Sequence, residues 1–278
     1  MIGEIRSPFR FPGSKAQALK FLMPIWENFK HVEYREPFIG GGAVFFAKAK
    51  SEHNWLNDID YDITTTYKVM ADPEARGKLI TMLNDVPVTK EKHTEIKNMI
   101  PTNDIETAFR TYYLSRTSYS GIINKAAWGY HEKKSVPPSR WKSRIEEAGK
   151  KLEGVKITNH DFTKVINAES DDNVFMFIDP PYFKADQKRA YTHSFEAEDH
   201  YRLEKTLKNT EHAFCLTYDN CEEIKELYSW ANIMEVSWRY HTANANLATR
   251  KMGMELIITN FVTQKKFIRE TISHSIYN

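Results

Sequence analysis

The sequence lacks the residue patterns that mark disulfide-stabilised and zinc-binding proteins. Its 278 residues include two cysteines, Cys215 and Cys221, and no Cys-x-x-Cys spacing. This scarcity excludes a disulfide framework and gives no zinc signature. Ten histidines are present, but no H-E-x-x-H motif, so we expect a protein that requires no metal.

Long apolar runs are also missing. No apolar segment reaches the roughly 18 residues needed to span a bilayer, and residues 1–15 contain no apolar core of the secretory type. We therefore expect a cytoplasmic protein that does not associate with membranes.

Neither sign of charge dominates the whole chain, but one segment is strongly basic. The sequence has 39 Lys and Arg against 37 Asp and Glu, a formal net charge of +2. Residues 116–156 alone contain ten Lys or Arg against four Glu. Such a local excess of positive charge indicates a negatively charged partner.

The sequence does contain a regular alternation of short apolar runs with helical patterns. Seven runs are typical of strands, at 34–39, 54–58, 155–161, 174–179, 212–219, 233–240 and 255–262. Helical patterns lie between them, at 43–50, 198–209 and 221–231. Strands that alternate with helices predict an α/β sheet with helices on both faces.

The alternation is interrupted between residues 59 and 155. Four helical periods occur there, at 61–70, 73–86, 89–100 and 104–115, and the basic stretch 115–154 follows as a predicted loop region. We predict a mostly helical insert over 59–155 within a sheet domain made of 1–58 and 156–278.

A glycine turn follows the first predicted strand. Gly40, Gly41 and Gly42 precede a helix, in the place where ligands bind at the carboxyl end of a strand. Neither G-x-G-x-x-G nor a phosphate loop is present, and a turn without a ligand is the alternative. Asp58, at the end of the next strand, is predicted either to accept hydrogen bonds from ribose hydroxyls or to cap a helix.

The N-terminal stretch RFPGSKAQALKFL (10–22) places a lysine at the mouth of a predicted helix. Lys15 is positioned to pair with a ligand carboxylate, with Phe11 packed beside it. The alternative is a solvated lysine in the first helical turn.

The run VFMFIDPPYF (174–183) ends in an acid and two prolines. Asp179 and Pro180 each precede a proline, which holds the strand end extended and rigid. The Asp179 carboxylate and the Pro180 carbonyl would form two fixed acceptors for a substrate NH₂ group. On an exocyclic amine they would stabilise the charge that develops on nitrogen, and Tyr182 would stack on the base. A strand terminator with a solvated acid is the alternative.

Together these motifs resemble a known enzyme family. In order, RFPGSK, EPFIGGGAVFF, NDID, HDF (160–162) and DPPY are similar to the motifs of Dam-type (D12 class, α-group) adenine-N6 DNA methyltransferases. The resemblance covers nearly the whole chain and implies a Rossmann-like, S-adenosylmethionine-dependent methyltransferase sheet. It assigns donor binding to Phe11, Lys15, Phe38, Gly40, Gly41, Gly42, Asp58, Asp161, Phe162 and Asp179, and catalysis to Asp179, Pro180, Pro181 and Tyr182. Many relatives have tryptophan where Phe11 stands.

The residues and the resemblance together predict one reaction. A methyl group passes from S-adenosylmethionine to N6 of an adenine flipped out of double-stranded DNA, by direct displacement without a covalent enzyme intermediate. Two alternatives are the same chemistry on RNA or a glutamine side chain, and a non-catalytic DNA-binding relative. A cognate restriction endonuclease that acts separately is a further expected partner.

The basic insert is the predicted target-recognition domain, since Lys and Arg neutralise phosphates and a few side chains read bases. After Asn124 the sequence departs from the pattern familiar in enzymes that methylate GATC. Segments 182–195 and 242–253 are further candidates for DNA contact. The predicted contacts in the insert are Arg116, Ser118, Tyr119, Lys125, Trp128, Lys133, Lys134, Arg140 and Lys142.

Overall fold

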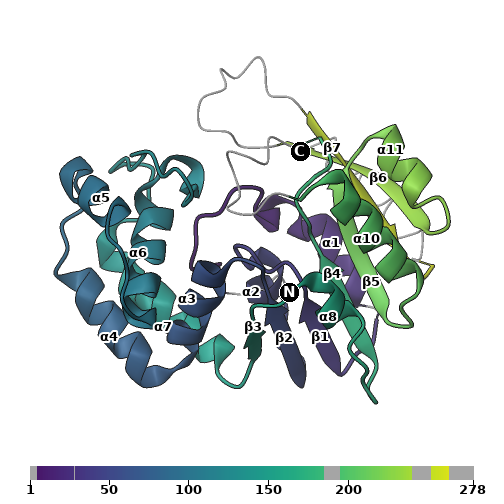
Figure 1. The fold of residues 1–278 in the computed structure, drawn as a ribbon, viewed down its shortest axis with the longest axis horizontal. Coiled ribbons are helices and arrows are strands. Elements are labelled where there is room, and N and C mark those ends of the chain that lie inside the picture. The colour runs from purple at the N-terminus through teal and green to yellow at the C-terminus, as the bar shows by residue number, and fades with distance from the viewer. Residues whose placement is uncertain (1–4, 28, 185–194, 240–251, 263–278) are drawn as a thin grey trace.

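The fold is built on one twisted sheet (Figure 1). A computed structural model describes residues 5–27, 29–184, 195–239 and 252–262. Within these ranges seven strands form the order β3-β2-β1-β4-β5-β7-β6, with β7 antiparallel to both of its neighbours and the other pairs parallel. All seven predicted strands are confirmed: β1 (Glu33–Glu36), β2 (His53–Asn57), β3 (Lys156–Thr158), β4 (Val174–Ile178), β5 (Ala213–Asp219), β6 (Asn232–Arg239) and β7 (Met252–Thr259).

Helices cover both faces of the sheet, as predicted. One face packs against α8 (Phe162–Ile166), α10 (Ala197–Lys208) and α11 (Glu222–Leu227). The other packs against α1 (Leu19–Glu27) and α2 (Ala43–Ala47). No helix in the described part of the chain combines the length and the apolar character that a bilayer crossing requires.

Strand β4 lies in the middle of the sheet and is buried on both sides. Val174, Met176 and Ile178 belong to the cluster under α10, whereas Phe175 and Phe177 belong to the cluster on the opposite face. A strand buried on both faces needs a continuous apolar run rather than an alternating one. The run therefore ends where the sheet ends, and it delivers the next residue to the carboxyl edge.

The insert between β2 and β3 is helical. It contains α3 (Tyr61–Ala71), α4 (Pro73–Asn84), α5 (Lys90–Lys97), α6 (Asp104–Thr117) and α7 (Trp141–Leu152), which gather on one side of the sheet, away from α10 and α11 (Figure 1). The four predicted helical periods are confirmed as α3 to α6.

The prediction that residues 115–154 are looped throughout is wrong, because α7 lies within them. Its buried residues Trp141, Ile145, Ala148 and Leu152 recur at intervals of three and four, which gives a helix one apolar face. Lysines, arginines and glutamates on the other face dominate the composition and hide this period.

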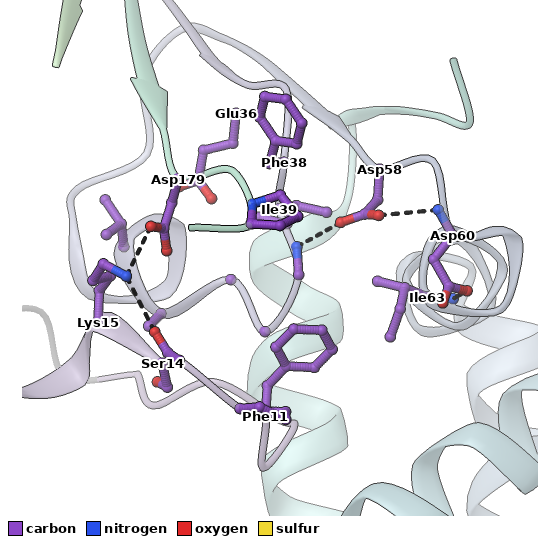
Figure 2. A pocket seen from close by; sticks show the side chains of 18 of the residues that line it. Phe11, Ser14, Lys15, Glu36, Phe38, Ile39, Asp58, Asp60, Ile63 and Asp179 are labelled. Carbon is purple, nitrogen blue, oxygen red and sulfur yellow. Dashed lines mark hydrogen bonds and ion pairs between the residues drawn. The ribbon is translucent and has the colours of Figure 1, made fainter. Parts of the chain in front are cut away.

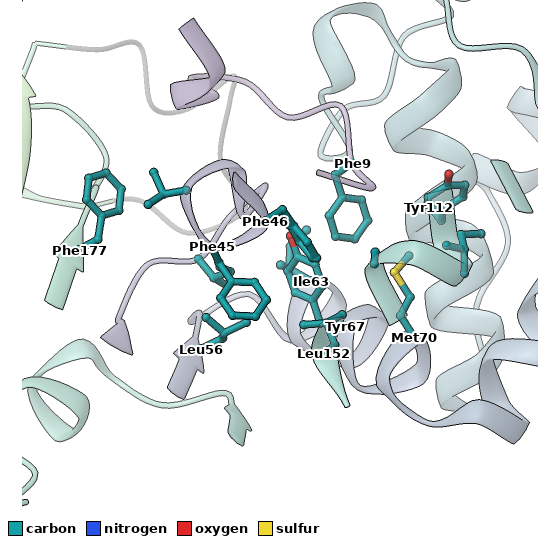
Figure 3. Packing of buried hydrophobic residues seen from close by; sticks show 14 of the residues in the cluster. Phe9, Phe45, Phe46, Leu56, Ile63, Tyr67, Met70, Tyr112, Leu152 and Phe177 are labelled. Atoms are coloured by element: carbon teal, nitrogen blue, oxygen red, sulfur yellow. The ribbon is translucent and has the colours of Figure 1, made fainter. Parts of the chain in front are cut away.

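One continuous core joins the insert to the sheet (Figure 3). Phe9 from the N-terminal segment packs edge-on against Tyr67 of α3, with ring centroids 5.0 Å apart, and also meets Tyr112 of α6 at 6.3 Å. Tyr67 in turn meets Phe46 of α2 at 5.9 Å. The N-terminal segment is thus packed between the insert and the sheet.

Candidate active site

A cavity opens at the carboxyl ends of β1, β2 and β4 (Figure 2). The strand order reverses between β1 and β4, and ligands of open α/β sheets bind at this switch point. The chain brings nine of the predicted residues into the lining: Phe11, Lys15, Phe38, Gly40, Gly41, Gly42, Asp58, Asp179 and Pro181.

Asp179 forms the centre of a polar cluster. Its Oδ1 lies 2.7 Å from Lys15 Nζ and accepts a hydrogen bond of 2.7 Å from Thr217 Oγ1 on β5. Both contacts use the same oxygen, so within the described residues Oδ2 has no hydrogen-bond donor. The carboxylate is therefore held in one orientation with an acceptor left over, and the alternative of a simple solvated strand terminator is wrong.

Lys15 is buried, with 6% of its surface exposed. It lies on a short 3₁₀ helix, η1 (Lys15–Gln17), and its Nζ donates to the Gly13 carbonyl at 3.2 Å and lies 4.7 Å from the centroid of the Tyr182 ring. A buried ammonium is unfavourable unless it is paired, and Asp179 supplies the pair. The alternative of a solvated first-turn lysine is wrong.

The glycine turn has the backbone that its sequence predicts. Gly40 and Gly42 have φ of +42° and +66°, in the left-handed region that favours glycine. A side chain on Gly41 would place its Cβ 2.6 Å from Phe11 Cβ. The turn is therefore closed against Phe11, and a larger residue at Gly41 has no room.

Asp58 holds this turn in place. Its Oδ2 accepts from the Gly40 N–H at 2.8 Å and its Oδ1 accepts from the Asp60 N–H at 3.0 Å. The N-cap of α3 is Asp60, which accepts from the Asp62 and Ile63 N–H groups, so the alternative role of Asp58 as a helix cap is wrong. Each carboxylate oxygen can accept more than one hydrogen bond, which leaves Asp58 capacity toward the cavity that it lines.

Three aromatic rings meet on the opposite wall. Phe38 stacks on Phe162 with centroids 5.3 Å apart and meets Phe195 edge-on at 5.7 Å. Phe38 and Phe195 line the cavity, whereas Phe162 is buried behind them. Asp161 caps α8 and pairs with Arg202 at 2.9 Å. In this conformation Asp161 and Phe162 support Phe38, and their contact with a donor stays a prediction.

Two buried carboxyl groups at the site were not predicted from the sequence. Glu255 of β7 is 1% exposed and accepts from the Tyr182 hydroxyl, and its Oε1 has no partner in the described structure. Burial raises the pKa of Glu255 to about 7. Glu36 of β1 is 2% exposed and lines the cavity, and burial raises its pKa to about 8. The available sequence clue was that each acid begins a motif: Glu255 opens the run ELIITN, and Glu36 opens EPFIGGG.

The charged groups of the cavity suit a cationic ligand. Glu36, Asp58, Asp60 and Asp179 line it, and Lys15 is the single cationic side chain among the described lining residues. The donor that the family resemblance implies, S-adenosylmethionine, carries a sulfonium, an ammonium and a ribose diol. Carboxylates, the glycine turn and an aromatic wall are suitable partners for those groups, so the residues present fit this cofactor.

The predicted DNA contacts of the insert fall into two groups. Arg116 and Ser118 are buried, at 6% and 0% exposure, and an Arg116 nitrogen donates to the Pro8 carbonyl. Tyr119 is 37% exposed, and Trp128 is half-buried with its ring against His93. The remaining candidates are exposed cations: Lys125, Lys133, Lys134, Arg140 and Lys142. Contact with DNA stays a prediction for all of them, and positions 185–194 and 242–251 lie outside the described residues.

Comparisons with known proteins agree with this geometry. A family model described as D12 class N6 adenine-specific DNA methyltransferase matches residues 11–242. The type II methyltransferase M1.LlaDCHI of Lactococcus lactis subsp. cremoris is 29% identical, over 91% of this chain and 95% of that protein. M.CviBI of Paramecium bursaria Chlorella virus NC1A is 25% identical over 82% and 87% of the two chains. M.MjaIII of Methanocaldococcus jannaschii is 26% identical over 93% and 100%.

Proposed function

This chain belongs to the D12 class of N6 adenine-specific DNA methyltransferases, and on that basis we propose which of its residues bind the donor, activate the amine and hold the DNA. It is a DNA adenine-N6 methyltransferase, and its family implies S-adenosylmethionine as methyl donor. One observation carries the assignment of roles. Asp179 is fixed through Oδ1, while its Oδ2 is left as an acceptor at a cavity that also contains the glycine turn and Asp58.

Donor binding is assigned to the wall formed by β1, β2 and the glycine turn. Asp58 accepts from the ribose hydroxyls while it holds Gly40, and Phe38 packs against the adenine of the donor. Gly41 and Gly42 let the backbone approach closely. Glu36 and Asp179 supply negative charge near the cationic groups, and Phe11 closes the turn from the other side.

Catalysis is assigned to Asp179 and the residues that fix it. The bound donor supplies a methyl group that is attached to a sulfonium sulfur. As the new N–C bond forms, the S–C bond breaks and the sulfur leaves as a neutral thioether. Asp179 Oδ2 and the Pro180 carbonyl accept hydrogen bonds from the two N6–H groups, which aims the nitrogen lone pair outward and stabilises its developing charge. N6 loses one proton after transfer, and we assign that proton to Asp179 Oδ2. Pro181 keeps the segment rigid, and Tyr182 provides an aromatic face.

DNA binding is assigned to the helical insert, 59–155, as the target-recognition domain. The catalytic domain is the sheet domain made of 1–58 and 156–278. The exposed cations of 116–156 neutralise phosphates. A separate restriction endonuclease is the proposed biological partner, because three relatives are named type II methyltransferases. Because the substrate is DNA, we also propose that the enzyme acts in the cytoplasm. No step of the proposed reaction requires a metal.

The proposal is tested by offering substrates in parallel. The protein and S-adenosylmethionine with a labelled methyl group are incubated in three parallel reactions, one with duplex DNA, one with RNA and one with protein. We expect label in duplex DNA, as N6-methyladenine at a single short sequence that sequencing then maps. Asp179→Ala should lose transfer yet retain duplex binding, because the pocket acid contributes little to phosphate contacts. Label mainly in RNA or protein, or near-normal transfer by Asp179→Ala, would overturn the assignment.

A further inference from the structure

A second cavity lies directly beside the donor cavity. Phe11 and Ser14 line both of them. The second cavity has one wall from the N-terminal segment, with Phe9 and Arg10, and another from the insert, with Arg116 and residues 134–136. It therefore lies where the sheet domain meets the insert, next to the site that we assign to the target base.

The second cavity is positively charged. Arg10, Arg116 and Lys134 line it, and none of the described lining residues is an Asp or Glu. Across the described ranges, none of the ion pairs involves any of these three cations. At Arg10, burial first and then the charge of Arg116 lower the pKa of the guanidinium. Arg144, on α7, has its pKa lowered by the same two causes.

Arg116 is the least expected member of this group, because it is 94% buried without an anion. One terminal nitrogen donates to the Pro8 carbonyl, and the guanidinium carbon lies 5.5 Å from the centroid of the Tyr112 ring. Its Nε has no hydrogen-bond partner in the described structure. Burying a charge without a counter-charge is strongly unfavourable. A cavity that holds this buried guanidinium together with Arg10 and Lys134 is suited to receive an anion from outside.

Ser135 adds a neutral donor to the same wall. Its Oγ accepts a hydrogen bond of 3.0 Å from the His131 N–H, so its own hydroxyl hydrogen remains to be donated. Two guanidinium groups, one ammonium and one hydroxyl are a suitable donor set for a tetrahedral oxyanion, since arginine binds phosphate oxygens in pairs and lysine acts as a point charge.

We propose that this cavity, lined by Arg10, Arg116, Lys134 and Ser135, binds one backbone phosphate of the DNA strand that carries the target adenine. The inference rests on the proposed function and adds to it a specific phosphate clamp. A base that leaves the stack stays attached to its sugar and phosphates, so a flipped adenine beside Asp179 brings a phosphate to the neighbouring cavity. The clamp would fix the position of the flipped nucleotide without reading its sequence.

The test uses duplexes that contain the mapped target, each with one phosphate near the adenine replaced by an uncharged methylphosphonate. In the wild-type enzyme, replacement at the clamped phosphate should weaken binding about tenfold. Lys134→Gln and Arg10→Gln should each weaken binding to the unmodified duplex to a similar extent and lower the slope of log affinity against log salt by about one. At the clamped phosphate, and at no other position, the methylphosphonate should cause little further loss of binding affinity in these variants.

Lys150→Gln is the matched control, because it removes one exposed cation of the same insert that does not line the cavity. It should leave sensitivity to the methylphosphonate at the clamped position unchanged. Donor affinity and thermal unfolding of each variant establish that the fold is intact.

Three outcomes decide the inference. If the losses from variant and methylphosphonate multiply at every position, no phosphate occupies the cavity and the clamp is refuted. If Arg10→Gln instead changes the preferred bases, the cavity reads a base edge and the phosphate assignment is also refuted. A wild-type enzyme that transfers no methyl group to DNA would refute the proposed function. Normal transfer, with no position at which the variants become insensitive to the methylphosphonate, would refute the clamp alone.

Discussion

Lys15 Nζ lies 2.7 Å from Asp179 Oδ1, and the pair joins the N-terminal segment to the end of the central strand. Thr217 donates to the same oxygen, so the carboxylate is held from two sides. The arrangement assigns Lys15 a positioning role in addition to any contact that it makes with the donor. It also explains why a lysine with 6% exposure is tolerated at this place.

Lys15→Met should lower kcat by about 100-fold, because a misoriented acceptor loses the alignment that transfer to the target amine requires. Stability should fall by about 2 kcal/mol, less than for a fully buried pair because Asp179 retains 21% exposure. Single-turnover transfer and urea unfolding measure the two effects. Lys78→Gln, which breaks an exposed pair with Glu74 on α4, is the control and should change neither.

A double-mutant cycle makes the test specific. Lys15→Met combined with Asp179→Asn should destabilise the protein by less than the sum of the two single substitutions, since either one removes the pair. Additive losses would show that Lys15 and Asp179 are energetically independent and would refute the positioning role.

Gly41→Ala should weaken donor binding about tenfold and destabilise the protein by about 1–3 kcal/mol. The added Cβ would come within 2.6 Å of Phe11 Cβ, so the turn or the Phe11 segment must shift. Gly77→Ala is a matched control in α4, where an added Cβ meets nothing within 4 Å, and it should stabilise the protein by about 0.5–1 kcal/mol. Equilibrium donor binding and urea unfolding check both variants. Unchanged donor affinity in Gly41→Ala would separate the turn from the donor site.

Local patterns in the sequence were sufficient for most of the fold and for the first layer of the site. Strands such as β4 are continuous apolar runs, and the motif residues Gly40, Asp58 and Asp179 follow strand ends, so parallel pairing alone brings them to one edge. Helix α7 was missed because charged residues hide its apolar period.

The parts of the site that the sequence could not predict depend on contacts between distant segments. Nothing local to Glu255 indicates that β7 will place it against Tyr182, and nothing local to Arg116 indicates that the Pro8 segment will bury it. Arg116 and Lys134 belong to one basic stretch, so composition alone did not separate them. Of the two, Lys134 is exposed and Arg116 is buried.

Donor affinity should rise with pH because Glu36, which lines the cavity, ionises. Burial raises the pKa of Glu36 to about 8, so this group is protonated at pH 6–7 in the donor-free protein. A cationic ligand favours the ionised form, and binding must then release a proton, which makes affinity rise by up to about tenfold per pH unit below pH 8. Lys48 and Asp179 also face Glu36 and act in opposite directions on it.

Titration calorimetry with wild type and Glu36→Gln between pH 6 and 7.5 checks this, because the difference between the two proteins cancels the titration of the donor itself. The variant should lose most of the pH dependence. Proton release measured in buffers of different ionisation enthalpy should fall in parallel. Identical pH profiles would show that Glu36 does not respond to the donor.

Glu255 should make the protein less stable as the pH rises through the mildly acidic range. Burial raises the pKa of Glu255 to about 7 in the folded protein, from an ordinary value of 4.5. The folded state therefore binds one more proton than the unfolded state between about pH 4.5 and 7, and the free energy of unfolding falls across that window. The total contribution is on the order of 3 kcal/mol. Glu36, with its raised pKa, contributes with the same sign, so the test compares proteins that differ at Glu255 alone.

Urea unfolding of wild type and Glu255→Gln at pH 5, 6 and 7 measures the effect. Glutamine keeps an acceptor for the Tyr182 hydroxyl but cannot ionise, so the variant should lose distinctly less stability than wild type between pH 5 and 7. Glu235→Gln, on the neighbouring strand β6, is the control, because that carboxylate is 51% exposed and paired with Lys225. It should leave this downward slope in place. If Glu255→Gln has the same slope as wild type, Glu255 ionises normally in the folded protein, and the buried acid beside Tyr182 is not the group that titrates.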